Sequence, residues 1–533
     1  MVGAHRFPVF ATVVYLGDIV SPKCVNMSSK RRVLLLGTMA FFVGMGVMAI
    51  EITASRILAP HFGASLFVWT SLIVTVLLAL SAGYWIGGIV AEKRGNMQTL
   101  GILLAASSGF LLIGLWMVKS FALSLSSIIF GWSNASLALF LGSLATSFFA
   151  FAIPVFMLAV ASPIIVKLWT EIDGHVGRVT GRYFAISTIG SVVGTIAPTL
   201  ILVPMLGAFM TLVVVSASLF VVSVITLSGR ERIIALVVVG VLLGVTANIQ
   251  QDRKQNIVYE KESPYQLIRV IDYSAEQRAI TFNEGLGIQS VSIPASGRTG
   301  YYYDHFAAVP FLHGDRAEKH SVVILGLAGG TAARQYTSQL SESADISMTG
   351  VEVDKEVIVA AERYMDLGEI DIDIVIMDAR MYLRQTEKKF DTIILDAFSV
   401  QLYIPSHLVT KEFFSLAHES LQEGGILVMN VNASERTSPL LEGITNSVAT
   451  AFSHVYVIKV KDGFWNYLVL ASEKELDLDA AASELSADFW DIANIWRTKS
   501  ETVVYDKNKF AFTDDKAPVE FMTENMILTS MLK

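Results

Sequence analysis

The sequence contains little cysteine, little proline and little charge. A single cysteine, Cys24, excludes a disulfide framework, a cysteine-based zinc site and a cysteine-held iron–sulfur cluster, and no metal site is expected. Thirteen prolines are too few for a proline-rich linker protein. Charged residues make up 17% of the chain and hydrophobic residues 53%, against about 25% and 45–50% in soluble domains. These figures exclude a disordered chain and argue against a wholly soluble one.

The net charge of −8 conceals a division of the chain near residue 250. Residues 1–250 hold 14 basic and 6 acidic residues and carry +8, whereas the remaining residues hold 26 basic and 42 acidic residues and carry −16. A basic, apolar first part and an acidic second part predict at least two domains in different solvents.

The first part contains long apolar stretches separated by small groups of charges. A helix needs about 20 apolar residues to cross a hydrocarbon core. Pro154 and Pro163 interrupt the longest stretch, which is either one kinked helix or two short crossings. We predict an N-terminal tail over residues 1–32 and a multi-pass α-helical domain over 33–250, with about seven spans: 33–56, 66–91, 97–118, 135–168, 183–204, 208–228 and 232–250.

Small residues recur at helix-contact spacing within these stretches. Gly83 and Gly87 are four residues apart, as are Gly190 and Gly194, which favours close packing of helices in lipid, inside a bundle or a homodimer. Glu51 is an acidic residue inside a predicted span, with Arg56 as a candidate partner. The alternative interpretation is a polar transport pathway around Glu51.

The clearest motif of the second part is a strand, a glycine turn, a helix and a second strand. It spans residues 321–354, SVVILGLAGGTAARQYTSQLSESADISMTGVEVD. The loop Gly326–Gly330 lets the backbone approach a ligand closely. Glu352, at the end of the second strand, is placed to bind both hydroxyls of a ribose.

Two classes of nucleotide use this plan. A dinucleotide site requires Gly-x-Gly-x-x-Gly, but the corresponding positions here hold Gly326, Ala328 and Thr331. An S-adenosylmethionine site has no phosphate to hold and tolerates a looser loop. The sequence therefore favours an adenosyl-sulfonium ligand over NAD.

The following segments continue the alternation of strands and helices. One predicted strand, 372–377, ends at Asp378 and Ala379, where an acid can accept the adenine amino group, and another, 390–395, ends at Asp396. Alternating strands and helices predict a doubly wound, mostly parallel sheet that binds its ligand at the carboxyl ends of the strands. Residues 257–291 predict a small β-sheet before it.

By these motifs the second part resembles the spermidine synthases, which are polyamine aminopropyltransferases with an S-adenosylmethionine-methyltransferase-like Rossmann fold. The resemblance continues in SPYQLIRV (263–270), GIQSV (287–291) and YYYDHFAAVPFLH (301–313). It implies nucleoside contacts from Gln266, Gln289, Gly326, Gly329, Gly330, Glu352, Asp378 and Ala379, and catalytic roles for Asp396 and Tyr302.

The first part resembles the membrane-fused version of the same family. The matching stretches are EITASRILAPHFGASLFVWTSLI (51–73) and GRYFAISTIGSVVGTIAP (181–198), and TDDKAPVE (513–520) is typical of that subgroup. The resemblance implies a small β subdomain over 251–315 and a catalytic domain over 316–533. Its substrates would be an amine and S-adenosylmethionine or its decarboxylated form, with no permanently bound cofactor and no nucleic acid.

The sequence departs from the family where the amine is handled. Gly329 and Ser399 stand where the family has aspartates, and Tyr303 replaces a histidine. The attacking amine must lose a proton, for which Asp396 is the best remaining base. Tyr303, Asp304, Asp514 and Asp515 are candidate substrate contacts. The three aspartates could replace the missing acids if they fold over the site.

Two other functions fit the same residues. One is methyl transfer or another reaction of the adenosyl-sulfonium on a small or lipid-borne substrate, and the other is a transporter or sensor with an inactive ligand-binding domain. With seven spans, the basic loops place the acidic domain outside the cytoplasm. Because S-adenosylmethionine is a cytoplasmic metabolite, we expect a multi-pass protein of the cell membrane with a cytoplasmic catalytic domain.

Overall fold

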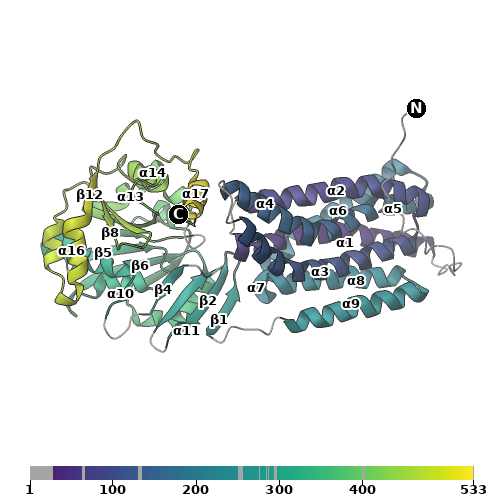
Figure 1. Cartoon of the computed structure of the whole chain (residues 1–533), viewed down its shortest axis with the longest axis horizontal. Helices are drawn as coiled ribbons and strands as arrows, with labels where there is room; N and C mark the ends of the chain where they lie inside the picture. The colour runs from purple at the N-terminus through teal and green to yellow at the C-terminus, as the bar shows by residue number, and fades with distance from the viewer. Residues whose placement is uncertain are drawn as a thin grey trace.

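The computed structural model describes residues 28–62, 66–129, 135–249, 256–274, 277–283, 285, 287–292, 297–317, 319–398 and 403–531. Figure 1 shows two parts placed end to end: a bundle of long helices and a compact α/β domain. Residues 28–249 form the first part, called here the helical half, and residues 256–531 form the second, called the α/β half. The division falls where the charge of the sequence changes sign.

The helices of the helical half follow the apolar stretches of the sequence. Two π-helical turns, Phe148–Ala152 and Pro198–Leu202, join successive helices into longer rods, so the proline-containing fourth stretch is one interrupted rod. In the described residues the helices are α1 Ser29–Phe62, α2 Leu66–Arg94, α3 Met97–Ile129, α4 Ala135–Ser147, α5 Ile153–Asp173, α6 Val176–Ala197, α7 Val203–Leu206, α8 Ala208–Thr226 and α9 Gly229–Ile249.

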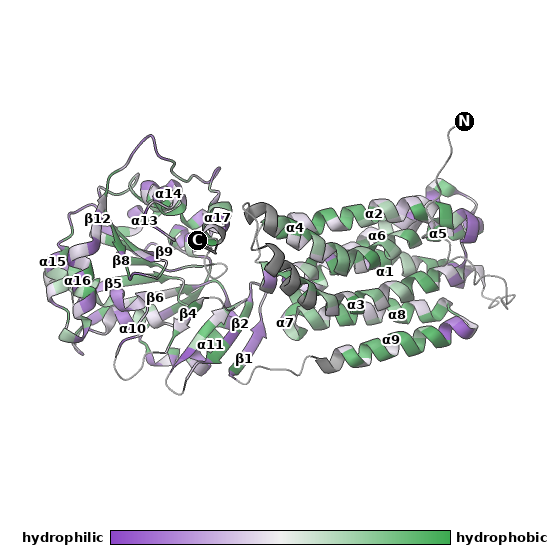
Figure 2. Ribbon diagram, viewed as in Figure 1, coloured by the Kyte–Doolittle hydropathy of each residue, from purple (hydrophilic) through white to green (hydrophobic). Residues whose placement is uncertain are grey.

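Six helical segments within the described residues are long and apolar enough to cross a membrane, by length and composition. Apolar residues cover these helices in Figure 2. The expected seventh span is present as the helix α9 but is not among the six. Three charged residues, Arg230, Glu231 and Arg232, lie in its first turn.

Glycines set the spacing of the helices. A side chain at Gly83 or Gly87 of α2 would collide with the backbone of α5, and one at Gly190 or Gly194 of α6 would collide with the backbone of α1. The predicted role of these small residues in close helix packing is therefore confirmed.

The α/β half begins with a four-stranded antiparallel sheet of the order β1-β2-β3-β4. Alternating apolar side chains pack this sheet against the rest of the α/β half. Its strands are β1 Ile257–Glu262, β2 Leu267–Asp272, β3 Arg278–Phe282 and β4 Ile288–Val291.

An eight-stranded mixed sheet follows, with the order β12-β10-β11-β9-β8-β5-β6-β7. Strands β7, β6, β5, β8 and β9 are parallel, and β11, β10 and β12 continue the sheet in antiparallel pairs. Apolar clusters cover both faces. The strands are β5 Lys319–Leu325, β6 Asp345–Glu352, β7 Asp373–Ile376, β8 Phe390–Leu395, β9 Leu421–Asn432, β10 His454–Lys459, β11 Asn466–Ser472 and β12 Ser500–Val503.

Eight helices surround this sheet in the described residues. The segment 421–425 is the first part of β9, where Gly424 (φ +75°) accommodates an irregularity in the pairing with β8. The helices are α10 Thr331–Thr337, α11 Lys355–Tyr364, α12 Ala379–Gln385, α13 Lys411–Ser420, α14 Pro439–Val448, α15 Leu478–Ser483, α16 Trp490–Lys499 and α17 Val519–Met531.

Hydrogen bonds join the two halves at one end of the bundle. The Arg56 guanidinium donates to the carbonyl oxygen of Pro264, so this arginine is bound to the α/β half. The backbone N–H of Ala208 donates to Glu262 Oε2 over 2.6 Å. In Figure 1, α7 lies at the end of the bundle that faces β1, and the two elements are in contact.

Candidate active site

The site is built around the loop that follows β5. Gly326 (φ +95°) turns the chain, and its N–H donates to the carbonyl of Val351 over 2.9 Å. A Cβ at this position would lie 2.5 Å from the carbonyl oxygen of Asp396. Glycine thus lets the loop after β5 lie against the end of β8. The carboxyl ends of β5 and β8 therefore meet at the same edge of the sheet.

Glu352, at the end of β6, is buried beneath this loop. Its carboxylate accepts the backbone N–H groups of Ala328 and Asp354, each over 3.1 Å. Burial outweighs these hydrogen bonds and raises the pKa of Glu352 to about 7. The carboxylate lies where a ribose is expected at the end of the second strand.

Asp378 follows β7 and caps α12. It accepts the N–H of Met381 over 3.0 Å and contacts His407 Nε2 over 2.9 Å. Burial favours the protonated form, but these partners prevail and lower the pKa of Asp378. Its side chain is about one-third exposed, so it can bind a ligand from the open side of the site.

Asp396, at the end of β8, is the central carboxylate of a polar network. Its two oxygens lie 3.0 and 2.8 Å from the Tyr302 hydroxyl, and Asn430 Nδ2 donates to it over 3.1 Å. Asn466 in turn donates to Asn430 and Asn432. Burial raises the pKa of Asp396 to about 6, although both donors oppose the change. Burial and the neighbouring carboxylate raise the pKa of Tyr302, so its phenol is a donor.

These strand ends enclose a cavity of about 290 Å³. It contains the carboxylates of Glu352, Asp378 and Asp396 together with the polar and aromatic groups that a nucleoside requires. Its lining includes the predicted residues Gln266, Gln289, Gly326, Glu352, Asp378, Ala379 and Asp396.

Two predicted loop residues are not part of this lining. Gly329 N–H donates to Ser290 Oγ over 2.7 Å, and a Cβ at position 329 would lie 2.7 Å from the Ser290 Cβ. Gly330 (φ +78°) precedes α10, and a Cβ there would lie 2.6 Å from Leu367 Cδ1. Both glycines are required by packing, and the structure does not place them in contact with the cavity.

The structure does not bring the candidate replacement acids to the cavity. Asp304 is buried and accepts from Thr299 and the N–H of Gly300, and Tyr303 packs on Tyr302 with its ring centroid 4.1 Å away.

Asp514 pairs with Arg380 through two contacts of 2.7 Å, which lower its pKa to about 2. Asp515 is exposed on the same turn. Ser399 lies outside the described residues.

Several residues of the site were not singled out as candidates from the sequence. His407 and Pro405 reach the cavity from the segment before α13, and Tyr265 and Phe282 reach it from the small sheet. Asn430 lies near the carboxyl end of the parallel strand β9, so the rule that identified Asp396 applies to it as well.

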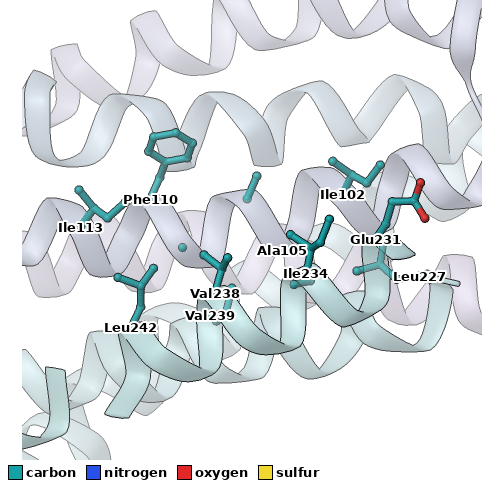
Figure 3. Close-up of a pocket in the computed structure, with 13 residues that line it drawn as sticks. Ile102, Ala105, Phe110, Ile113, Leu227, Glu231, Ile234, Val238, Val239 and Leu242 are labelled. Carbon is teal, nitrogen blue, oxygen red and sulfur yellow. The ribbon is translucent and has the colours of Figure 1, made fainter. Parts of the chain in front are cut away.

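A different cavity lies in the helical half, between α3 and α9. Its volume is about 400 Å³, and apolar side chains such as Phe110 and Val238 line it, with Glu231 at one end (Figure 3). This groove has no convergent polar groups for chemistry, so the cavity at the strand ends is the candidate active site.

Known proteins are similar to the α/β half in sequence. Residues 304–480 match the spermine/spermidine synthase domain. The chain is 30% identical over 289 residues to a probable polyamine aminopropyl transferase of Bifidobacterium longum, covering 50% of this chain and 62% of that protein. It is 26% identical over 285 residues to the polyamine aminopropyltransferase of Vibrio vulnificus, covering 50% and 92%. A probable spermidine synthase structure from Corynebacterium glutamicum superimposes with a TM-score of 0.40 and 21% identity, covering 48% and 96%.

The fold and the strand-end carboxylates define an α/β domain with a polar cavity at the carboxyl ends of its strands, preceded by apolar helices. Its particular kind follows from the matches: the α/β half contains a spermidine synthase domain with polyamine aminopropyltransferase homologues. The matched region spans less than two-thirds of the Bifidobacterium longum relative.

Proposed function

We propose that this protein is a membrane-anchored transferase that moves an aminopropyl group from decarboxylated S-adenosylmethionine to a polyamine-type amine. The observation that carries this proposal is the convergence of Glu352, Asp378 and Asp396 on one cavity. Glu352 and Asp378 bind the ribose and the adenine amino group in this proposal. Asp396, which lies beside Tyr302, accepts the proton of the attacking amine.

The proposed reaction needs one base. A neutral amine attacks the carbon next to the sulfonium, the carbon–sulfur bond breaks, and its electron pair stays on sulfur, which leaves as methylthioadenosine. The new nitrogen–carbon bond leaves a proton on nitrogen, which Asp396 accepts. A pKa of about 6 suits this step, because the carboxylate is ionised at neutral pH yet still able to hold a proton.

Position 329 supports a second candidate function. The family aspartate that grips the donor amine is absent there, and a Cβ at this position would lie only 2.7 Å from the Ser290 Cβ. A site without that carboxylate repels the carboxylate of intact S-adenosylmethionine less strongly. Methyl transfer from S-adenosylmethionine is therefore the alternative reaction.

We also propose an orientation in the membrane. Arg56, Leu66 and Ala208 contact the α/β half, so the other ends of α1, α2 and α8 face away from it. Ten basic residues cluster at that far end: Lys30, Arg31, Arg32, Lys93, Arg94, Lys167, Arg178, Arg182, Arg230 and Arg232. Cytoplasmic ends are rich in Lys and Arg, which supports a catalytic domain on the opposite face, contrary to the cytoplasmic placement expected from the donor.

Incubation of the purified full-length protein with each donor tests the reaction. With putrescine or spermidine, decarboxylated S-adenosylmethionine should give an aminopropylated product by mass spectrometry, together with methylthioadenosine. Asp396→Asn should abolish turnover but retain methylthioadenosine binding, while Asp371→Asn, on the surface, should leave both unchanged. Products from S-adenosylmethionine alone would establish the alternative, and turnover by Asp396→Asn would refute the assigned base.

A further inference from the structure

A second polar cavity lies where the two halves meet. Its volume is about 710 Å³, and we call it the junction cavity. Tyr265 lines both the junction cavity and the candidate active site at the strand ends. The helical half contributes the end of α1, the start of α2 and the turn between α7 and α8, and the α/β half contributes β1 and the turn after it. The lining includes Ser55, Arg56, Trp69, Met205, Leu206, Gly207, Glu260, Lys261 and Glu262.

The helix geometry places this cavity at the depth of lipid headgroups. Arg56 lies 23 positions after Val33 on α1, which corresponds to about 35 Å along a helix and exceeds a hydrocarbon core of about 30 Å. Trp69 lies 24 positions before Lys93 on α2, a similar length. An arginine and a tryptophan at this depth are typical of the membrane interface.

The charges around the cavity are balanced. Arg56 and Lys261 are cationic, and Glu260 and Glu262 are anionic. Lys261 and Glu260 each have a partner on the α/β half, yet their side chains stay 38% and 41% exposed. Burial raises the pKa of Glu262, a carboxylate that a nearby ammonium would stabilise.

The remaining wall of the cavity is apolar. Met205 is 75% exposed and Trp69 is 36% exposed, and both belong to helices that cross the proposed membrane. A ligand that satisfies this lining therefore needs one positive and one negative group together with a hydrocarbon part.

We propose that the junction cavity binds an aminophospholipid, with its phosphate at Arg56 and Lys261, its ammonium at Glu260 and Glu262, and its chains along Trp69 and Met205. The proposal rests on the membrane anchoring proposed above, not on the transferase reaction. A primary ammonium donates three hydrogen bonds to the two carboxylates, which a quaternary ammonium cannot do.

The junction cavity also adjoins the nucleoside site through one short turn. Ser263 hydrogen-bonds Asp354, two residues beyond Glu352, and the Gln266 N–H donates to Ser263 Oγ over 3.0 Å. Glu262, at the start of this turn, is bonded to Ala208 of the helical half. A headgroup bound at Glu262 therefore contacts the same turn that carries Tyr265 and Gln266 to the nucleoside.

Retention of lipid by the full-length protein tests the site. The protein is placed in nanodiscs of phosphatidylcholine with a minor fraction of phosphatidylethanolamine, and the lipid that stays bound after release is identified by native mass spectrometry. We expect one phosphatidylethanolamine per chain, enriched about tenfold or more over phosphatidylcholine, which corresponds to about 1.4 kcal/mol. Glu262→Gln and Arg56→Gln should remove the enrichment, whereas Glu231→Gln, at the far end of the bundle, should keep it.

One more variant and one more ligand complete the lipid-retention experiment. Glu260→Gln, at a half-exposed position, should weaken the enrichment without disturbing the junction, and the thermal unfolding midpoint reports whether each variant is folded. Free phosphoethanolamine should not be retained, because it lacks the hydrocarbon part that contacts Trp69 and Met205. Equal retention of both lipids, retention of free phosphoethanolamine, or enrichment that survives in folded Glu262→Gln and Arg56→Gln would overturn the proposal.

Discussion

Removal of one hydroxyl group should move the pH dependence of the proposed reaction. Tyr302→Phe deletes the donor that lies 2.8 Å from Asp396 and leaves the ring in its buried position. A hydrogen bond to a charged group contributes about 1.5–3 kcal/mol, which corresponds to about one to two pKa units. The pKa of Asp396, about 6 in the native protein, should therefore rise to about 7–8 in the variant.

The higher pKa of Asp396 in Tyr302→Phe should slow turnover at pH 7. If Asp396 acts as the base, the rate depends on its ionised fraction, which at pH 7 is about nine-tenths for a pKa of 6. That fraction falls to between about one-half and one-tenth for a pKa of 7–8. Turnover by Tyr302→Phe at pH 7 should thus drop about twofold to tenfold and recover near pH 9.

The assay is product formation measured by mass spectrometry across the pH range, for the native protein and for Tyr302→Phe. The infrared carboxyl band gives a readout that does not depend on turnover, because a protonated Asp396 should be detected at pH 7 in the variant. Asn430→Ala should shift the profile in the same direction, since Asn430 is the other side-chain donor to this carboxylate. An acidic limb that stays at the same pH in both variants would refute the reasoning.

Three other predictions follow from the site and the fold. Methylthioadenosine affinity should increase as pH rises through about 7, because the ribose hydroxyls donate to the ionised form of Glu352. By calorimetry, Glu352→Gln should bind methylthioadenosine weakly and with an affinity that does not depend on pH. An affinity of Glu352→Gln that still depends on pH would contradict the assignment. Gly329→Ala should lower stability by about 1–3 kcal/mol in thermal unfolding, because its Cβ overlaps Ser290, and the added change Ser290→Gly should restore it. In a Cys24→Ser background, Glu475→Cys on the surface of the α/β half should react with a membrane-impermeant maleimide in intact cells, and protection from it would place this half in the cytoplasm.

The strand-end carboxylates could be predicted because their placement depends on local sequence and one topological rule. Glu352, Asp378 and Asp396 each follow an apolar run, and the carboxyl ends of parallel strands lie at one edge of a sheet. The apolar helices were predictable for a similar reason, since their length and composition are local properties.

The parts of the site that could not be predicted depend on contacts between distant segments. Asp514 belongs to an acidic turn whose residue types suggest a substrate contact. In the structure, Arg380, which lies 134 positions earlier in the chain, binds its carboxylate. His407 reaches Asp378 from a segment without a motif. The sequence around Gly329 is that of an ordinary glycine loop. A side chain at this position would collide with Ser290 only because the small sheet packs on the loop.

The contact between Gly329 and Ser290 also fixes the order in which this sequence can change. An aspartate at position 329 would place its Cβ 2.7 Å from the Ser290 Cβ, so the protein that acquires the acid first passes through an overpacked intermediate. The route through glycine at position 290 avoids that intermediate. The two positions are therefore epistatic, and an acid at position 329 fits only after a permissive change 39 residues upstream.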